Sequence, residues 1–253
     1  GGATDTRQAA TGGLDIEMGT FTDGKIKEAE FGYNDYYLAD KFEKLVKEGQ
    51  IPMAVLNEKV SRVLRLIFRT SMNRQKAIGS QCSEAHYDAC RSIGEEGIVM
   101  LKNRKSLLPL DLTKYKRVLV IGENAVRSLT QGGGSSELKT LRDTSPLEAL
   151  RKLHTTDYAQ GYESGRAIYE RQEKIDANKQ EQLHEEALQK AKNADLIIFV
   201  GGLNKNYQQD CENSDRQSYD LPFGQNDLIA NIIKQKPSNC PIVIVTFGGN
   251  AYA

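Results

Sequence analysis

The run Leu196-Ile197-Ile198-Phe199-Val200-Gly201-Gly202 decides the fold of this chain. It is a continuous apolar run rich in β-branched residues, which is typical of a strand buried on both faces of a parallel sheet. Similar runs occupy residues 117–121 and 242–247. Helical patterns at 183–191 and 228–233 separate the three runs. Strands that alternate with helices predict a doubly wound, largely parallel α/β sandwich domain.

A polar loop follows the central run at residues 210–216, with the sequence Asp-Cys-Glu-Asn-Ser-Asp-Arg. In parallel α/β sheets, ligands bind at the loops that leave the carboxyl ends of the strands. Carboxylates and an arginine in such a loop suit a site that binds sugars or transfers protons. A solvated acidic loop is the alternative, and composition alone favours it. The charged side chains are Asp210, Glu212, Asp215, Arg216 and the nearby Asp220.

Three glycine clusters also follow predicted strands, at 132–136, 201–202 and 248–250. If the strands are parallel, these clusters and the loop at 202–221 lie along one edge of the sheet, where glycine lets the backbone approach a ligand closely. A dinucleotide site is the first alternative. Residues 121–125 lack the Gly-x-Gly-x-x-Gly spacing, however, and we expect no cofactor.

Nucleophilic and metal chemistry have little support in the sequence. There is no Gly-x-Ser-x-Gly elbow, and His184 lies in a charged helical segment, where a surface position is expected. The cysteines form no Cys-x-x-Cys pair and have no histidine at metal-ligand spacing, so no metal site is expected. Carboxylate chemistry remains. Free thiols and one or two disulfides are both compatible with the four cysteines, Cys82, Cys90, Cys211 and Cys240.

The composition indicates a folded protein that does not bind nucleic acid. Of the 253 residues, 39% are hydrophobic and 27% are charged, which allows a sizeable core. The formal net charge of zero argues against a nucleic-acid surface, and no apolar run approaches the length of a membrane span. From the opening Gly1-Gly2-Ala3-Thr4, which lacks an initiator Met, we expect no signal peptide and a piece of a longer protein.

Residues 1–75 differ in rhythm from the rest. A strand is predicted at 13–19, then one helix around 38–45 and a second helix with an apolar stripe at helical spacing. Arg62 falls off that stripe and is expected on a solvated face. One strand and two helices do not close a domain, so this region needs further sequence to pack against. The stripe consists of Val60, Val63, Leu64, Ile67 and Phe68.

Residues 76–95 are polar and predict a linker that runs into a short helix. The sandwich domain is expected over 96–253, truncated at its C-terminus, with a strand at 97–103. A further helix is predicted to start at Ser145-Pro146-Leu147-Glu148, with the serine as N-cap, the proline at the first helical position and the glutamate completing a capping box.

Five motifs stand out along the chain: Gly13-Leu14-Asp15-Ile16-Glu17-Met18, residues 96–103 (Glu-Gly-Ile-Val-Met-Leu-Lys-Asn) with Leu107-Leu108-Pro109-Leu110, residues 118–125 (Val-Leu-Val-Ile-Gly-Glu-Asn-Ala), Gly132-Gly133-Gly134-Ser135-Ser136, and Glu212 to Arg216 with Asp220-Leu221-Pro222. Together and in this order they resemble glycoside hydrolase family 3, the β-glucosidases and their relatives. The resemblance runs from residue 1 to the end, and no single motif carries it alone.

In that family a TIM-like barrel is paired with an α/β sandwich, and the active site lies between them. The resemblance implies that residues 1–75 are the C-terminal part of the barrel domain. It places the nucleophile, an aspartate, one or two residues before Gly1. The family's general acid/base is a glutamate followed shortly by Asp-Arg, which matches Glu212 with Asp215-Arg216. Asn213 replaces the usual glycine and also tolerates positive φ.

Asp210 is the runner-up for the acid/base role. A retaining glycosidase needs two carboxyl groups roughly 5–5.5 Å apart, one ionised and one protonated. A guanidinium lowers the pKa of a neighbouring carboxyl, so Arg216 is expected to pair with Asp215 or to contact the sugar. The expected substrate-binding residues are Asp215, Arg216, Gly133 and Ser135.

The resemblance therefore implies part of a retaining, exo-acting β-glycosidase, with β-glucosidase ahead of xylosidase, N-acetylglucosaminidase and arabinofuranosidase. The expected partners are an oligosaccharide or β-glucoside substrate and the missing barrel portion, without nucleic acid or membrane, and the chain alone is expected to be inactive. A periplasmic or secreted bacterial location is favoured by the resemblance. The alternative is a non-catalytic carbohydrate-binding or scaffold α/β domain.

Overall fold

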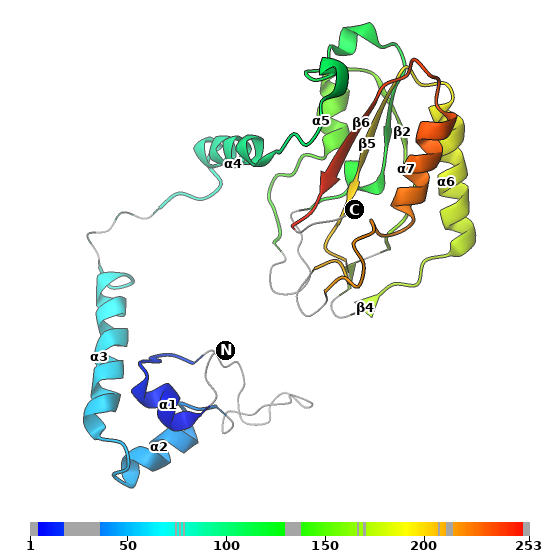
Figure 1. Ribbon diagram of the computed structural model, residues 1–253. Helices are drawn as coiled ribbons and strands as arrows, with labels where there is room; N and C mark the ends of the chain where they lie inside the picture. Colours follow the sequence, from blue (N-terminus) through cyan, green and yellow to red (C-terminus); the bar gives the residue numbers. More distant parts are fainter. Residues whose placement is uncertain are drawn as a thin grey trace. The chain divides into compact units, whose positions relative to one another are not determined.

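The computed structural model of the chain describes residues 5–17, 36–73, 75, 77, 79–129, 138–165, 167–168, 171–206, 208–210 and 215–249. It divides the chain into two compact units, Gly1–Ser83 and Glu84–Ala253 (Figure 1). Over the ranges given, no helix is long and apolar enough to cross a membrane.

Four parallel strands form the central sheet of the second unit (Figure 1). β1 (Val118–Ile121) pairs with β5 (Leu196–Gly202), and β5 pairs with β6 (Ile242–Phe247), as the apolar runs predict. β2 (Thr156–Ala159) pairs with the other side of β1, which gives the order β2-β1-β5-β6. Every residue of β5 is buried, because this strand has a neighbour on each side. The predicted parallel α/β sheet is confirmed.

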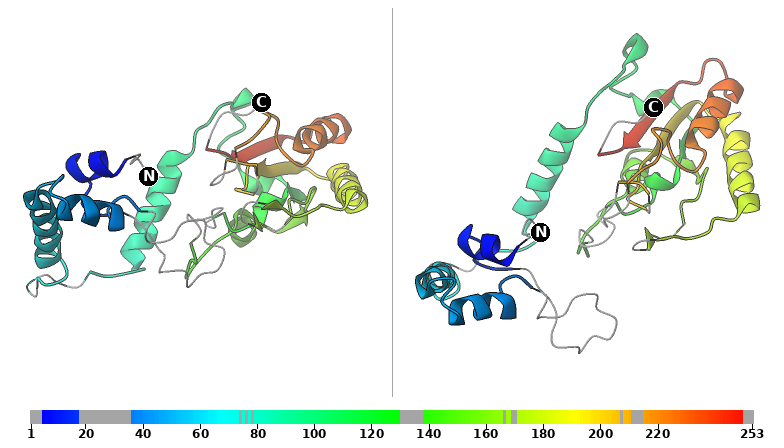
Figure 2. Two further views of the ribbon diagram at one scale, coloured as in Figure 1. Left: turned by 90° about the horizontal axis from the view of Figure 1, so that it is seen from below. Right: turned by 60° about the horizontal axis from the view of Figure 1, so that its bottom comes forward.

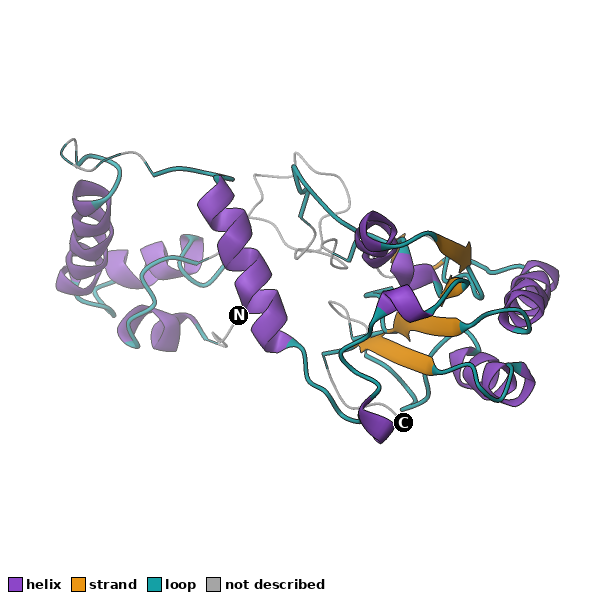
Figure 3. Ribbon diagram, turned by 90° about the horizontal axis from the view of Figure 1, so that it is seen from above, coloured by secondary structure: helices purple, strands orange, loops and turns teal. Residues whose placement is uncertain are grey.

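Helices cover both faces of this sheet (Figure 3). On one face lie α6 (Ala177–Ala191) and α7 (Gln225–Gln235), side by side in both views of Figure 2. Leu228 of α7 shares a buried cluster with Phe199 of β5. On the other face, α5 (Pro146–Leu153) contributes to a second cluster with the alternate residues of the same strands. Two apolar layers therefore hold the central strands rigidly in place.

The start of α5 confirms the serine N-cap and the proline of the predicted helix signal, but the structure shows the Glu148 carboxylate paired along the helix rather than closing the predicted capping box. Ser145 has an extended backbone, and its hydroxyl accepts a hydrogen bond from Glu148 N at 3.2 Å. Pro146 occupies the first turn, where a missing N–H costs nothing. The carboxylate of Glu148 pairs with Lys152 at 3.1 Å, one turn along the helix.

The strand predicted at 97–103 is wrong. Helix α4 (Glu84–Gly97) extends to Gly97, and residues 98–103 adopt no regular structure. Ile98 and Leu101 are 78% and 83% exposed, and in the described part of the chain no strand pairs with them. An apolar run forms a strand only where a partner satisfies its backbone groups. Periodicity does not report whether that partner is present.

The sequence does not predict β2. Its residues Thr156-Asp157-Tyr158-Ala159 are buried at both ends and exposed at Asp157, a pattern that suits an edge strand with one partner. A short antiparallel pair, β3 (Ala167–Ile168) and β4 (Arg171–Gln172), follows it. Short 3₁₀ turns η2 (Arg104–Ser106) and η3 (Leu112–Lys114) precede β1.

Three helices make up the described part of the first unit: α1 (Thr6–Thr11), α2 (Asp40–Lys47) and α3 (Met53–Arg69). The last two confirm the two predicted helices. Between them the unit has a small core, in which Phe42 and Ile51 are buried.

The strand predicted at 13–19 does not form over its described residues. This segment instead bonds to α3. Lys59 Nζ donates to the backbone oxygen of Leu14 at 2.6 Å, and Arg62 Nε donates to Asp15 Oδ2 at 2.7 Å. Bonds to a helix thus replace the strand partner. Arg62 is partly exposed, as predicted, but it is also ion-paired.

The predicted apolar stripe of α3 lies exposed. Val60, Leu64 and Phe68 are 46%, 44% and 59% exposed. Because exposed apolar patches promote association, the 253-residue chain should self-associate, and sedimentation velocity should detect species larger than the monomer. Replacing both Leu64 and Phe68 by lysine should restore the monomer. Arg69→Glu changes a charge on the opposite face of α3 and should not restore it, and a monomeric wild-type chain would contradict the expectation.

Candidate functional site at the carboxyl edge of the sheet

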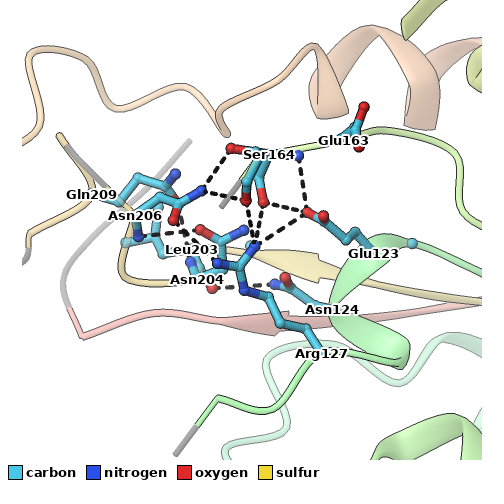
Figure 4. A network of polar contacts seen from close by, with 12 residues as sticks. Glu123, Asn124, Arg127, Glu163, Ser164, Leu203, Asn204, Asn206 and Gln209 are labelled. Carbon is cyan, nitrogen blue, oxygen red and sulfur yellow. Dashed lines mark hydrogen bonds and ion pairs between the residues drawn. The ribbon is translucent and has the colours of Figure 1, made fainter. Parts of the chain in front are cut away.

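Polar segments follow three neighbouring strands at one edge of the sheet (Figure 4). The 3₁₀ turn η4 (Glu123–Ala125) follows β1, and residues 160–165 follow β2. Residues 203–224 follow β5 and are called the β5–α7 loop below. Hydrogen bonds join the three segments, because Asn124 Nδ2 donates to Leu203 O at 3.1 Å and Asn206 Nδ2 donates to Ser164 O at 2.7 Å. Of the segments expected to share this edge, the loop at 202–221 and Gly248-Gly249 follow the carboxyl ends of the paired parallel strands β5 and β6, whereas 131–136 and Asn250 lie outside the described residues.

Arg127 is the cation at the centre of this cluster (Figure 4). Its Nη1 donates to Ser164 Oγ at 2.5 Å and to Gly165 O at 3.3 Å, and its Nη2 donates to Asn206 Oδ1 at 3.1 Å. Glu123 Oε2 lies 3.6 Å from Arg127 Nη1, and only 18% of the Arg127 side chain and 14% of the Glu123 side chain are exposed. One largely buried ion pair thus links the ends of three strands.

Glu123 is the matching anion. Its carboxylate accepts hydrogen bonds from Ser164 N, at 3.0 Å, and from the Ser164 hydroxyl. Burial raises the pKa of Glu123 above its ordinary value, against the opposing effects of the Ser164 hydrogen bond and the Arg127 charge. The site therefore holds a carboxyl group whose ionised form is costly despite its cation.

Stability should depend on pH through this group. A carboxyl with a higher pKa in the folded state binds its proton more tightly there. Its contribution to the free energy of unfolding is therefore full at low pH and is lost as pH rises through the folded pKa. Glu123→Gln mimics the protonated side chain at every pH. In thermal unfolding of the full-length protein, the variant should match wild type in acid and gain stability relative to it as pH rises above about 4.3.

Asp195 provides a control of opposite sign. The hydrogen bond that Asp195 accepts from Arg117 lowers the pKa of Asp195. The contribution of Asp195 to the free energy of unfolding is therefore present above the unfolded pKa and is lost as pH falls through the folded pKa. Asp195→Asn should therefore be less stable than wild type at neutral pH and converge with it in strong acid. A Glu123→Gln difference that is constant with pH would contradict the raised pKa.

Side-chain amides fix the first half of the β5–α7 loop. Gln209 Oε1 accepts a hydrogen bond from Asn204 N at 3.0 Å, and Asn204 Oδ1 accepts one from Asn206 N at 3.3 Å. All three side chains are buried. At the end of β5, Gln225 bonds both backbone groups of Gly202, at 2.8 and 3.0 Å. The loop is therefore anchored at its start and internally.

Arg216 pairs with Asp210. Its Nε donates to Asp210 Oδ2 at 2.8 Å and its backbone N–H donates to Oδ1 at 3.1 Å. Of the two roles expected for Arg216, pairing with Asp215 is not what the structure shows, since Asp215 is exposed, and contact with the sugar stays a prediction. Both oxygens of the Asp210 carboxylate thus accept a hydrogen bond from Arg216. Spacing in the sequence alone did not distinguish Asp210 from Asp215 as the partner. This ion pair connects the two described ends of the segment that contains Glu212.

The remaining predicted site residues, Glu212, Gly133 and Ser135, lie outside the described residues. The cluster of Glu123, Arg127, Ser164 and Asn206 is the part of the site that sequence reasoning missed. A usable signal was Glu123-Asn124 directly after the apolar run of β1, because polar residues at a strand's carboxyl end mark the ligand-binding edge.

A family model described as the Glycosyl hydrolase family 3 C-terminal domain matches residues 98–253 of the chain. The chain belongs to glycoside hydrolase family 3. This confirms the resemblance given by the sequence motifs. The matched region includes the whole four-stranded sheet and the polar cluster at its carboxyl edge.

Similar curated proteins are longer. Beta-glucosidase BoGH3A of Bacteroides ovatus is 52% identical over 99% of this chain and 34% of its own length. Thermostable beta-glucosidase B of Acetivibrio thermocellus is 30% identical over 99% of this chain and 30% of its own length. The chain thus spans about a third of the length of these two curated relatives. Among solved structures, DesR, a beta-glucosidase from Streptomyces venezuelae in complex with D-glucose, shares the fold with a TM-score of 0.75 at 19% identity, over 96% of this chain and 43% of its own.

Within the described residues, the other reactive side chains do not form a second centre. His184 is half-buried between α6 and the turn at Gly224 rather than on the surface, and burial lowers the pKa of His184. Cys82 and Cys90 are exposed free thiols, and Cys240 is a buried one. Among the described residues, no group of three histidine, cysteine or acidic side chains could hold a metal ion.

Proposed function

We propose that this chain is part of a retaining, exo-acting β-glycosidase that hydrolyses terminal β-linked glucosides. The observation that carries the proposal is the 52% identity with a protein named beta-glucosidase over nearly the whole chain. The anchored, polar β5–α7 loop at the carboxyl edge of the sheet supports it, because this edge is where α/β domains bind ligands.

Glu212 is the general acid/base in this proposal. A retaining mechanism needs a protonated carboxyl to assist the leaving group and an ionised carboxylate to attack the sugar. Asp210 suits the acid role poorly, since both oxygens of its carboxylate already accept a hydrogen bond from Arg216. Asp215 and Arg216 in the second half of the loop, together with Gly133 and Ser135, are proposed to bind the substrate.

Residues 1–75 are proposed to be the C-terminal part of a TIM-like barrel whose other strands and nucleophile precede Gly1. The small core of this unit and the exposed stripe on α3 support that proposal, because both need a larger partner. Residues 1–253 by themselves should then hydrolyse no glycoside, since only one of the two catalytic carboxyl groups would be present.

A panel of nitrophenyl glycosides assayed with the full-length protein tests the function. The β-glucoside should give the highest kcat/KM, ahead of the β-xyloside, the N-acetyl-β-glucosaminide and the α-arabinofuranoside. Proton NMR of the early product should show the β-anomer, as retention requires. Sugar binding without turnover would instead establish the non-catalytic alternative, and α-glucose as first product would exclude a retaining mechanism.

A further inference from the structure

The β5–α7 loop is held in a strained backbone. Lys205, Gln208 and Asp210 all have positive φ, between 58° and 60°. Residues other than glycine persist in this region only where the surrounding structure over-determines them, and such residues cluster at functional sites. The contacts that impose this conformation therefore matter for what the loop does.

Arg127 supplies one of those contacts from outside the loop. Its guanidinium bonds Asn206 of the loop and Ser164 of the segment after β2, while Asn206 Nδ2 returns a bond to Ser164 O at 2.7 Å. The result is a closed triangle of hydrogen bonds among three segments (Figure 4). A planar guanidinium can reach two acceptors in fixed directions, which a lysine ammonium on a flexible stem does less well.

The polarity of the cluster is also informative. A largely buried ion pair is often no more stabilising than an apolar replacement, because both charges lose their hydration. An apolar pair could therefore serve the stability of this edge equally well. What Arg127 adds is direction, because its acceptors Gly165, Asn206 and Glu123 lie on three different segments.

We propose that Arg127 is a positioning residue for the glycosidase reaction: through Asn206 it fixes the β5–α7 loop where that loop presents Glu212 to the glycosidic oxygen. The inference rests on the proposed function. A general acid must stand within hydrogen-bond reach of the atom it protonates. Displacement by about 1 Å can cost roughly 100-fold in rate.

The readout that separates positioning from stability is the dependence on the leaving group. In full-length protein, Arg127→Met should lower kcat/KM on cellobiose by on the order of 10- to 100-fold. It should lower kcat/KM on 2,4-dinitrophenyl β-glucoside by less than about 3-fold, because that leaving group needs no proton. Most of the loss should be in kcat, with KM little changed.

Arg117→Met is the matched control. Arg117 also forms an arginine–carboxylate pair, with Asp195 at 2.7 Å, but at the amino ends of β1 and β5. The control should lower the melting temperature without changing the ratio of the two kcat/KM values. Asn206→Ala should reproduce the selective loss. The double variant Arg127→Met/Asn206→Ala should lose no more than about twofold beyond Arg127→Met, because the two side chains act as one unit.

An even loss on both substrates, or additive losses in the double variant, would overturn the positioning role. If Arg127→Met does not fold, Asn206→Ala alone decides by the same ratio. A wild-type enzyme without glycosidase activity, or a Glu212→Ala variant without selective loss, would remove the proposed function and this inference with it. If the wild type is active and Glu212→Ala shows the selective loss, but Arg127→Met loses activity evenly on both substrates, only the positioning role of Arg127 is removed.

Discussion

Glu212→Ala in the full-length protein should lower kcat/KM on cellobiose-like substrates by about 10²–10⁴-fold, the usual contribution of general acid catalysis. The loss should be much smaller on 2,4-dinitrophenyl β-glucoside, whose phenolate leaves without a proton. That substrate should then accumulate the glycosyl-enzyme, since the same carboxyl activates water in the second step. Steady-state kinetics on both substrates, with a burst measurement on the activated one, tests this.

Azide gives the positive control for this variant. A small anion can enter the space left by the carboxyl and attack the glycosyl-enzyme without general base assistance, so added azide should restore part of the lost rate and yield β-glucosyl azide. Asp210→Ala is the matched carboxylate control. Because Asp210 is ion-paired with Arg216, its loss should disturb the loop that positions Glu212 and give a selective loss smaller than that of Glu212→Ala, without rescue by azide. If Asp210→Ala instead shows the full selective loss and the azide rescue, the acid lies two residues earlier.

The sequence predicts those strands of the sheet that are buried on both faces. β5 is apolar along its whole length because it has strands on both sides and helices on both faces, and its sequence alone reports that environment. β2 has one strand neighbour and an exposed Asp157, so its pattern is indistinguishable from a polar loop. The run at 98–101 is apolar but exposed in this chain. Composition indicates that such a segment tends to be buried, but it does not show whether a partner that would bury it is present.

The site could be predicted only in part, for a related reason. The acidic loop after β5 is continuous in sequence, so its position at the carboxyl edge follows from the strand before it. Arg127 and Asn206 are 79 residues apart, and only the register of β1 against β5 brings them together. Arg216 had two carboxylate candidates nearby in sequence, and the choice of Asp210 over Asp215 depends on loop geometry that spacing does not encode.

Gly122→Ala should be the most destabilising small substitution in the sandwich domain. Gly122 ends β1, directly before Glu123, with φ +126°, a conformation that other residues rarely adopt. A Cβ there would lie 2.0 Å from the backbone oxygen of Val200. Strained φ/ψ costs about 1–3 kcal/mol and overpacking about 1–3 kcal/mol. The clash is with backbone of the central strand, so rotamer changes cannot relieve it.

The expected result is a first calorimetric transition lowered by roughly 4–24 °C in the full-length protein, at about 2–4 °C per kcal/mol for a domain of this size. Gly94→Ala is the control, because a Cβ at Gly94 meets nothing within 4 Å and alanine is the better helix former within α4. That variant should be neutral or more stable. Since Gly122 separates β1 from η4, movement of the strand end would also displace Glu123 and the Arg127 cluster, so the β5–α7 loop should become more susceptible to proteolysis in Gly122→Ala than in Gly94→Ala. Equal melting temperatures for the two variants would show that β1 ends differently from the conformation described above.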